Sequence, residues 1–205
     1  MELKNYQKRA IRQVRIFLEL LAAQQAKGNK HASMDAWEEA SEQLPISAQY
    51  RERKNGLGAD VPTFCVKVPT GGGKTLLATQ FLGLLNQTIH KTRNGAGLVL
   101  WVVPSDQIYK DTLRTLRDRK HFYREFLEFA VSRRVEVWEK HEIARLTPGQ
   151  LQSNFNILLL KLAGTNRIDR EQLKFFRDSG GNIVQHFPPE DEPRKHKALK
   201  DLAGC

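Results

Sequence analysis

The sequence has few of the residues that cross-link a chain or hold it in a membrane. Its only cysteines are Cys65, inside an apolar run, and Cys205, at the end. Two cysteines so placed exclude a disulfide scaffold and a four-cysteine zinc site. No apolar run approaches the ~18–20 residues that span a bilayer, and the N-terminal residues lack the apolar segment of a secretory signal. These absences predict a cytoplasmic protein without a membrane partner.

Acidic residues are outnumbered by basic ones. The 205 residues include 33 Lys and Arg against 23 Asp and Glu, which gives a formal net charge of +10. Such an excess favours a polyanionic partner, most often nucleic acid, although it also serves solubility alone. Six histidines without paired metal-ligand spacing do not indicate a zinc site. The length suits one domain, or little more.

The N-terminal part predicts helices and one strand. Apolar residues recur every three or four positions over residues 3–26, which predicts one amphipathic helix ending near Gly28. We interpret residues 28–60 as an irregular connection with one short helix, for which Asp35 is a candidate cap. The β-branched and apolar run 63–68 predicts a strand buried on both faces, with Cys65 inside it.

The rest of the chain alternates helices and strands. A helix is expected from Lys74 to about residue 89, a second buried strand at 98–103, and a third strand at 155–160. Ser105 is a candidate cap for a helix that follows the second strand, with Asp106 helping to start it, and we expect Trp101 in the core. Residues 179–195 predict a loop. This alternation predicts an α/β fold with a mainly parallel sheet flanked by helices.

The most informative segment runs Val68-Pro-Thr-Gly-Gly-Gly-Lys-Thr75. Successive glycines let backbone N–H groups converge on an anion, and the following helix adds its positive end. In such loops the lysine, here Lys74, reaches the phosphates, and the hydroxyl of Thr75 is a ligand for magnesium. The strict pattern has glycine where this chain has Val68, and the alternative is a simple glycine-rich turn between strand and helix.

This segment resembles motif I of superfamily two DEAD/DEAH-like helicases, and most closely that of the Res subunits of type III restriction enzymes. Three further stretches are similar to the same proteins. Leu3–Gln7 resembles a Tyr-Gln segment that contacts adenine, and Leu98–Ser105 resembles motif Ia at the nucleic-acid groove. Residues 175–181 together with 187–191 resemble a loop that precedes the acidic motif in these proteins.

The resemblance implies a partial RecA-like P-loop NTPase domain, with residues 1–205 forming the N-terminal part of the first such domain. It implies ATP and Mg²⁺ as cofactors, DNA as a partner, and a modification or specificity subunit. Lys74 would be catalytic and Thr75 would bind magnesium. The nucleotide-binding residues would be Tyr6, Gln7, Thr70, Gly71, Gly72, Gly73, Lys74 and Thr75.

The family's Asp-Glu-x-His motif has no convincing equivalent in the sequence. Asp191 and Glu192 are not preceded by an apolar strand, Asp106 lies three residues beyond one, and residues 158–160 lead only to Lys161. We therefore expect a chain that ends before this motif, binds ATP and hydrolyses almost none. The alternative is a non-catalytic nucleic-acid-binding module with a vestigial loop. A third possibility is another P-loop enzyme, such as a small-molecule kinase. Such an enzyme would need an aspartate directly after a core strand, and the sequence shows none.

A basic helix face is predicted just beyond Ser105. Lys110, Arg114 and Arg117 are spaced i, i+4 and i+7, so they share one side of the helix. Together with Ser105 they are candidates for binding DNA phosphates, because arginine and lysine supply most such contacts. A solvated helix face is the alternative.

Overall fold

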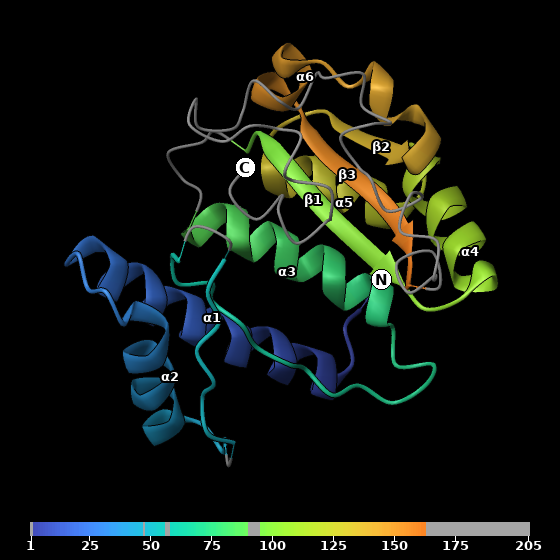
Figure 1. Ribbon diagram of the computed structural model, residues 1–205. Coiled ribbons are helices and arrows are strands. Elements are labelled where there is room, and N and C mark those ends of the chain that lie inside the picture. The colour runs from blue at the N-terminus through green and yellow to red at the C-terminus, as the bar shows by residue number, and fades with distance from the viewer. Residues whose placement is uncertain (1, 47, 56–57, 90–94, 163–205) are drawn as a thin grey trace. The chain divides into compact units, whose positions relative to one another are not determined.

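The computed structural model describes residues 2–46, 48–55, 58–89 and 95–162 (Figure 1). The chain forms two compact units, Met1–Thr92 and Arg93–Cys205, which are described in turn. The predicted loop at 179–195 and the resemblances at 175–191 lie outside the described residues. Within the described part, no helix is long and apolar enough to cross a membrane.

The first unit is built on three helices: α1 (Asn5–Ala26), α2 (Ala32–Gln43) and α3 (Lys74–Thr88). Helix α1 packs against both α2 and α3. Its buried apolar residues include Val14, Phe17 and Leu21, which confirms the predicted spacing. They form one cluster with Ala36 of α2 and Leu84 of α3. The core of this unit is therefore made by helix packing.

Helix α2 begins earlier than predicted. His31 stands at its N-cap position, so the candidate cap Asp35 lies inside the first turn instead. The Asp35 carboxylate accepts a hydrogen bond of 2.6 Å from Nδ2 of Asn29. The carboxylate of Asp60 accepts from the N–H (3.2 Å) and the hydroxyl of Ser33. Residues 28–60 thus contain a helix that is tied to the loop beyond it.

The prediction of a strand at residues 63–68 is wrong. The segment is extended, but no strand ladder is assigned to it within the described residues. Its side chains alternate: Phe64 and Val66 pack against the helical core, whereas Cys65 and Lys67 are exposed. Cys65 is a free, exposed thiol, so its expected burial is also wrong. The apolar run has one covered face, which packs against the helical core of this unit.

The second unit contains a three-stranded sheet. Its strands are β1 (Gly97–Val103), β2 (Val135–Glu139) and β3 (Phe155–Lys161), in the order β1-β3-β2 with both pairs parallel. Between the strands run α4 (Asp106–Arg117), α5 (Phe122–Val131), the 3₁₀ helix η2 (Lys140–Arg145) and α6 (Pro148–Ser153). The mixed α/β class with a parallel sheet flanked by helices is confirmed.

Strand β3 forms the centre of the sheet and is buried from Phe155 to Leu160. Leu158 and Leu160 pack on one face with Ile143 of η2 and with Leu146, the residue that follows η2. Ile157 and Leu159 point to the opposite face because side chains alternate along a strand, and α4 and α5 contact the same sheet, with α5 behind it in Figure 1. This central strand is therefore covered on both sides.

Strand β1 is less buried than predicted. It lies at one edge of the described sheet, where Leu100 and Val102 are 40% and 48% exposed. Trp101, expected in the core, is half-buried. The prediction of the strand itself is confirmed, but an apolar run indicates only that a strand can be buried.

Candidate functional site

The glycine-rich segment forms a tight loop that leads directly into α3. Gly73 stands at the N-cap position of α3, and Gly71 and Gly73 have φ angles of 71° and 75°. The N–H of Gly72 donates a 3.0 Å hydrogen bond to the carbonyl of Pro69, which closes the turn. Left-handed backbone favours glycine, so this loop shape needs glycine at both positions.

The loop is also closely packed. A Cβ added to Gly72 would lie 2.6 Å from Cγ1 of Val68 and 2.8 Å from the carbonyl oxygen of Pro69. A Cβ added to Gly73 would lie 2.8 Å from Nε2 of Gln7. Close contacts therefore require glycine at positions 72 and 73, and positive φ angles favour it at positions 71 and 73. A simple glycine-rich turn at the surface would not need this packing.

Positive charge gathers at the start of α3. The helix has no acidic residue in its first turn, so no carboxylate of that turn offsets the positive end of its dipole. Lys74 is exposed, and its ammonium donates a 3.0 Å hydrogen bond to the Pro69 carbonyl. Thr75 follows in the first turn and is half-buried, while Thr70 is exposed in the loop. Backbone N–H groups, a lysine and a hydroxyl in this arrangement suit a phosphate group.

Helix α1 contacts the loop through two adjacent side chains. The hydroxyl of Tyr6 and Nε2 of Gln7 both donate to the carbonyl oxygen of Gly72, at 3.0 Å and 3.1 Å. Gln7 is only 4% exposed, and its Oε1 accepts a 2.9 Å hydrogen bond from the N–H of Lys4. The structure thus brings Tyr6 and Gln7 into contact with the loop, through hydrogen bonds that the sequence did not indicate.

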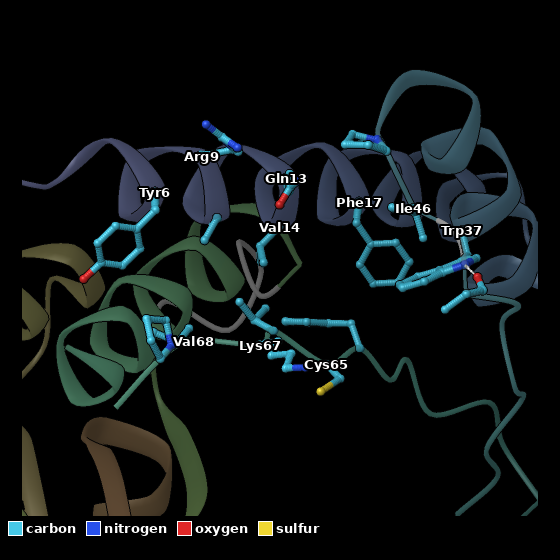
Figure 2. Close-up of a pocket in the computed structure, with 16 residues that line it drawn as sticks. Tyr6, Arg9, Gln13, Val14, Phe17, Trp37, Ile46, Cys65, Lys67 and Val68 are labelled. Atoms are coloured by element: carbon cyan, nitrogen blue, oxygen red, sulfur yellow. Dashed lines mark hydrogen bonds between the residues drawn. The ribbon is translucent and has the colours of Figure 1, made fainter. Parts of the chain in front are cut away.

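A cavity of about 870 Å³ lies beside the loop in the same unit. Figure 2 shows Val14 and Phe17 of α1 facing the extended segment that ends at Val68, whereas Arg9 points away from it. The cavity is partly aromatic, because Phe17, Trp37 and Phe64 are among the residues that line it. The Tyr6 ring lines this cavity, whereas Gln7 does not. The cavity offers room for a flat, partly apolar group next to the phosphate-binding loop.

The predicted basic helix face belongs to the other unit. Ser105 caps α4 by accepting from the N–H of Ile108 at 3.4 Å, as predicted. Lys110 and Arg114 are exposed, and Arg114 pairs with Asp111 of its own helix at 3.1 Å. Both remain accessible to a partner.

Arg117 is engaged differently from its neighbours on the same face. Its guanidinium pairs with Glu139 at 3.1 Å, pairs with Glu142, and donates to the Val137 carbonyl at 3.3 Å. The Tyr109 hydroxyl donates to the same Glu139 at 2.8 Å. Burial, followed by the hydrogen bond to Glu139, raises the pKa of Tyr109 well above its usual value. Arg117 therefore joins α4 to β2 and η2.

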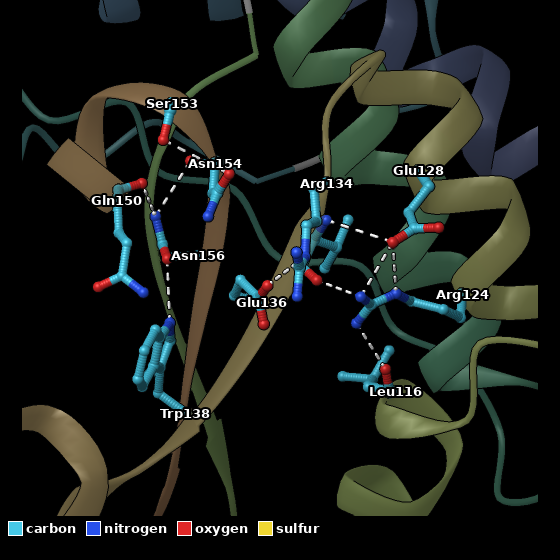
Figure 3. A network of polar contacts seen from close by, with 11 residues as sticks. Leu116, Arg124, Glu128, Arg134, Glu136, Trp138, Gln150, Ser153, Asn154 and Asn156 are labelled. Atoms are coloured by element: carbon cyan, nitrogen blue, oxygen red, sulfur yellow. Dashed lines mark hydrogen bonds and ion pairs between the residues drawn. The ribbon is translucent and has the colours of Figure 1, made fainter. Parts of the chain in front are cut away.

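A second polar network holds α4, α5 and β2 together (Figure 3). Arg124 is 3% exposed and donates to the carbonyls of Leu116 (2.8 Å) and Val135. It also pairs with Glu128 at 2.9 Å. Buried arginine is stable only when its donors are satisfied, so this residue is structural. Its burial could not be predicted from the sequence, because a lone arginine in a helix rich in aromatic residues gives no signal of burial.

The comparisons with known proteins gave one match. The sequence model of the family described as ResIII, type III restriction enzyme, res subunit, matches residues 1–184. No curated protein and no solved structure matches the chain.

Proposed function

Because the chain belongs to the family of type III restriction enzyme res subunits, we propose that its glycine-rich loop binds the triphosphate of ATP within a helicase-like module. One observation carries the proposal: the loop at the N-terminus of α3 is shaped by glycines that close contacts require. Thr70, Gly71, Gly72, Gly73 and Lys74 would hold the phosphates. Lys74, the catalytic residue of this proposal, would supply the mobile positive charge that stabilises transferring phosphate.

Magnesium is the second element of the proposed site. Thr75 offers a hydroxyl oxygen at the start of α3, and oxygen is the ligand type that Mg²⁺ prefers. When bound, the ion would neutralise phosphate charge. We expect Thr75→Val to weaken ATP binding in Mg²⁺ but not in EDTA, and Thr75→Ser to restore it. Equal loss in both buffers would show that the hydroxyl does not serve the metal.

Tyr6 and Gln7 complete the proposed nucleotide site. The Tyr6 ring lines the cavity beside the loop, where a stacked adenine would be partly buried. The amide of Gln7 donates to the loop itself. Its place in the proposed site is therefore next to the phosphate-binding loop.

We propose that hydrolysis by the 205-residue chain is very slow. Its described strands end next to carboxylates that already have partners: Asp106 pairs with Lys161, and Glu139 binds Tyr109 and Arg117. Each of these carboxylates would have to give up its partner before it could order magnesium or water, the role that the acidic residues have in phosphoryl-transfer enzymes. A DNA-stimulated turnover of about 1–100 s⁻¹, normal for phosphoryl-transfer enzymes, would overturn this part of the proposal.

DNA is the proposed macromolecular partner, with Ser105, Lys110, Arg114 and Arg117 as candidate phosphate contacts. The exposed pair Lys110 and Arg114 supports this directly, whereas Arg117 would have to leave Glu139 and Glu142. We expect the double variant Lys110→Gln/Arg114→Gln to reduce the salt dependence of DNA binding by about two phosphate contacts. The matched control Lys27→Gln/Lys30→Gln removes two charges from the first unit and should leave that dependence unchanged.

A non-catalytic nucleic-acid-binding module with a vestigial loop is the competing function. The hydrogen bond of Lys74 to the Pro69 carbonyl favours it, because the lysine is occupied within the loop. A salt titration of DNA binding with and without Mg-ATP separates the two functions. A nucleotide effect that Lys74→Ala abolishes supports the ATP-binding module, and identical curves support the vestigial loop.

The domain, the partner subunit and the cellular compartment of this module are also part of the proposal. We propose that it forms part of a first RecA-like domain, that it works with a modification or specificity subunit, and that it acts in the cytoplasm. The family supports the first two. The free thiol of Cys65 suits a reducing compartment.

A further inference from the structure

We infer that Tyr6 and Gln7 act together as a latch on the Gly72–Gly73 peptide, and so set the phosphate affinity of the loop whatever base the nucleotide carries. This inference rests on the proposed nucleotide site. It assigns the two residues a positioning role on the loop backbone, separate from any contact with a base.

The latch uses the full accepting capacity of one carbonyl. A peptide oxygen has two lone pairs, and the Gly72 oxygen accepts from the Tyr6 hydroxyl at 3.0 Å and from Nε2 of Gln7 at 3.1 Å. Gly72 is itself buried. Two donors on one helix therefore hold one peptide of the loop from the same side.

The planar peptide bond between Gly72 and Gly73 fixes the direction of the Gly73 N–H group once the Gly72 carbonyl is held. The chain has no cis peptide bond within its described residues, so the carbonyl of Gly72 and the N–H of Gly73 point in opposite directions. Because α1 holds the oxygen, the Gly73 N–H is directed away from α1. No described residue accepts a hydrogen bond from this N–H. It is thus a donor whose direction is fixed, as an anion site requires.

The peptide needs such a constraint because glycine lies on both sides of it. Glycine populates positive and negative φ angles about equally, so a Gly-Gly peptide can rotate with little steric cost. Gly73 holds a φ of 75°, and its Cα is so close to Gln7 that a Cβ would lie 2.8 Å from Nε2. Helix α1 therefore supplies the order that the glycines lack.

The position of Gln7 argues against a role in reading a base. Its amide is 4% exposed, its nitrogen donates to Gly72, and its oxygen accepts from the N–H of Lys4 at 2.9 Å. To contact a base, the amide would have to give up both hydrogen bonds, which leaves buried polar groups unsatisfied. The effect of the latch should therefore fall equally on every ligand that has the same phosphates.

The central test is Tyr6→Phe in the full 205-residue chain, because it removes one hydroxyl and keeps the ring that lines the cavity. We expect it to weaken the binding of Mg-ATP, Mg-GTP and inorganic tripolyphosphate by the same factor, about 2- to 10-fold for one hydrogen bond. Tyr50→Phe is the matched control, since that hydroxyl bonds to the Thr63 N–H, away from the loop. It should change none of the three affinities.

A second pair of variants tests the amide. Gln7→Met should weaken the same three ligands equally, whereas Gln25→Met, at an exposed position of the same helix away from the cavity, should not. A spectroscopic measurement needs no ligand: the Gly73 amide resonance of the nucleotide-free chain should move in Tyr6→Phe and stay in Tyr50→Phe. This resonance tests the latch even if the loop does not bind ATP. Unchanged affinities of Lys74→Ala for all three ligands would show that the loop is not the nucleotide site.

Two results would overturn the latch. One is a Tyr6→Phe chain that loses affinity for ATP while keeping it for GTP and tripolyphosphate, because the hydroxyl would then be reading the base. The other is a Tyr6→Phe chain with unchanged affinities and an unmoved Gly73 resonance, because the loop would then hold its shape alone.

Discussion

Replacing single glycines by alanine separates the steric and the dihedral requirements of the loop. In Gly72→Ala the new methyl group would meet the Val68 side chain at 2.6 Å and the Pro69 carbonyl at 2.8 Å. The valine can rotate, but the carbonyl is backbone and accepts hydrogen bonds from both Gly72 and Lys74. The loop must therefore open. We expect a loss of about 1–3 kcal/mol in unfolding free energy, typical of overpacking, and a loss of Mg-ATP affinity of more than tenfold.

Two other glycines provide the comparison. Gly71 has a φ of 71° and open space around it, so Gly71→Ala should cost only the dihedral strain of about 1–2 kcal/mol and should reduce Mg-ATP affinity less. Gly149 lies within α6, without a positive φ or a close neighbour. Gly149→Ala should stabilise the chain by about 0.5–1 kcal/mol.

Urea unfolding followed by circular dichroism gives the stabilities, and calorimetric titration gives the Mg-ATP affinities. The decisive comparison is between Gly72→Ala and Gly71→Ala, which alter neighbouring residues for different reasons. If Gly72→Ala binds Mg-ATP as well as the unaltered chain, the packed loop is not the phosphate site. If Gly71→Ala loses more affinity than Gly72→Ala, dihedral strain outweighs close packing in shaping the loop.

Two further predictions concern the second unit. Arg124→Met should lower the unfolding free energy by about 2–5 kcal/mol, measured by urea unfolding, because it removes the guanidinium that donates to the carbonyls of Leu116 and Val135 and pairs with Glu128. A loss below 1 kcal/mol would contradict its structural role. The pKa of Tyr109 is raised in the folded state, so its contribution is fully present below the unfolded value of about 10 and is lost as the pH rises above it. Stability between pH 9 and 11 should therefore fall more steeply for the unaltered chain than for Tyr109→Phe, and parallel curves would refute the reasoning.

Elements with strong local patterns were predictable from the sequence. The spacing of Val14, Phe17 and Leu21 gave α1, and the run that became β3 is buried almost throughout. Ser105 was predictable as a cap because its role depends only on the residues just after it. In each case the local sequence and the final fold favour the same structure.

Elements that depend on distant partners were not predictable. Strand β2 has only five residues and contains Glu136 and Glu139, so its sequence gives little apolar signal. Its strand conformation depends on pairing with β3, which lies about 20 residues further along the chain. Residues 63–68 show the reverse, because an apolar run cannot specify whether a neighbouring strand is present. Their extended backbone has one face against helices.

The candidate site was predictable as a loop but not as a set of contacts. Glycine, lysine and threonine at this spacing already indicated phosphate binding, and the structure adds the close packing at Gly72. The burial of Gln7 was missed because a glutamine does not count in a search for apolar spacing. Its position, seven residues before the buried Val14, places it on the same face of α1, and that spacing was the available signal.

Calorimetric titration of Mg-ATP into the full chain and into Lys74→Ala tests the central claim most directly. We predict saturable binding by the unaltered chain, and a loss of about 10- to 100-fold when the charged donor is removed, with circular dichroism showing the same fold in both. Equal binding by the two chains, or none by the unaltered chain, would contradict the assignment of the glycine-rich loop as a nucleotide site.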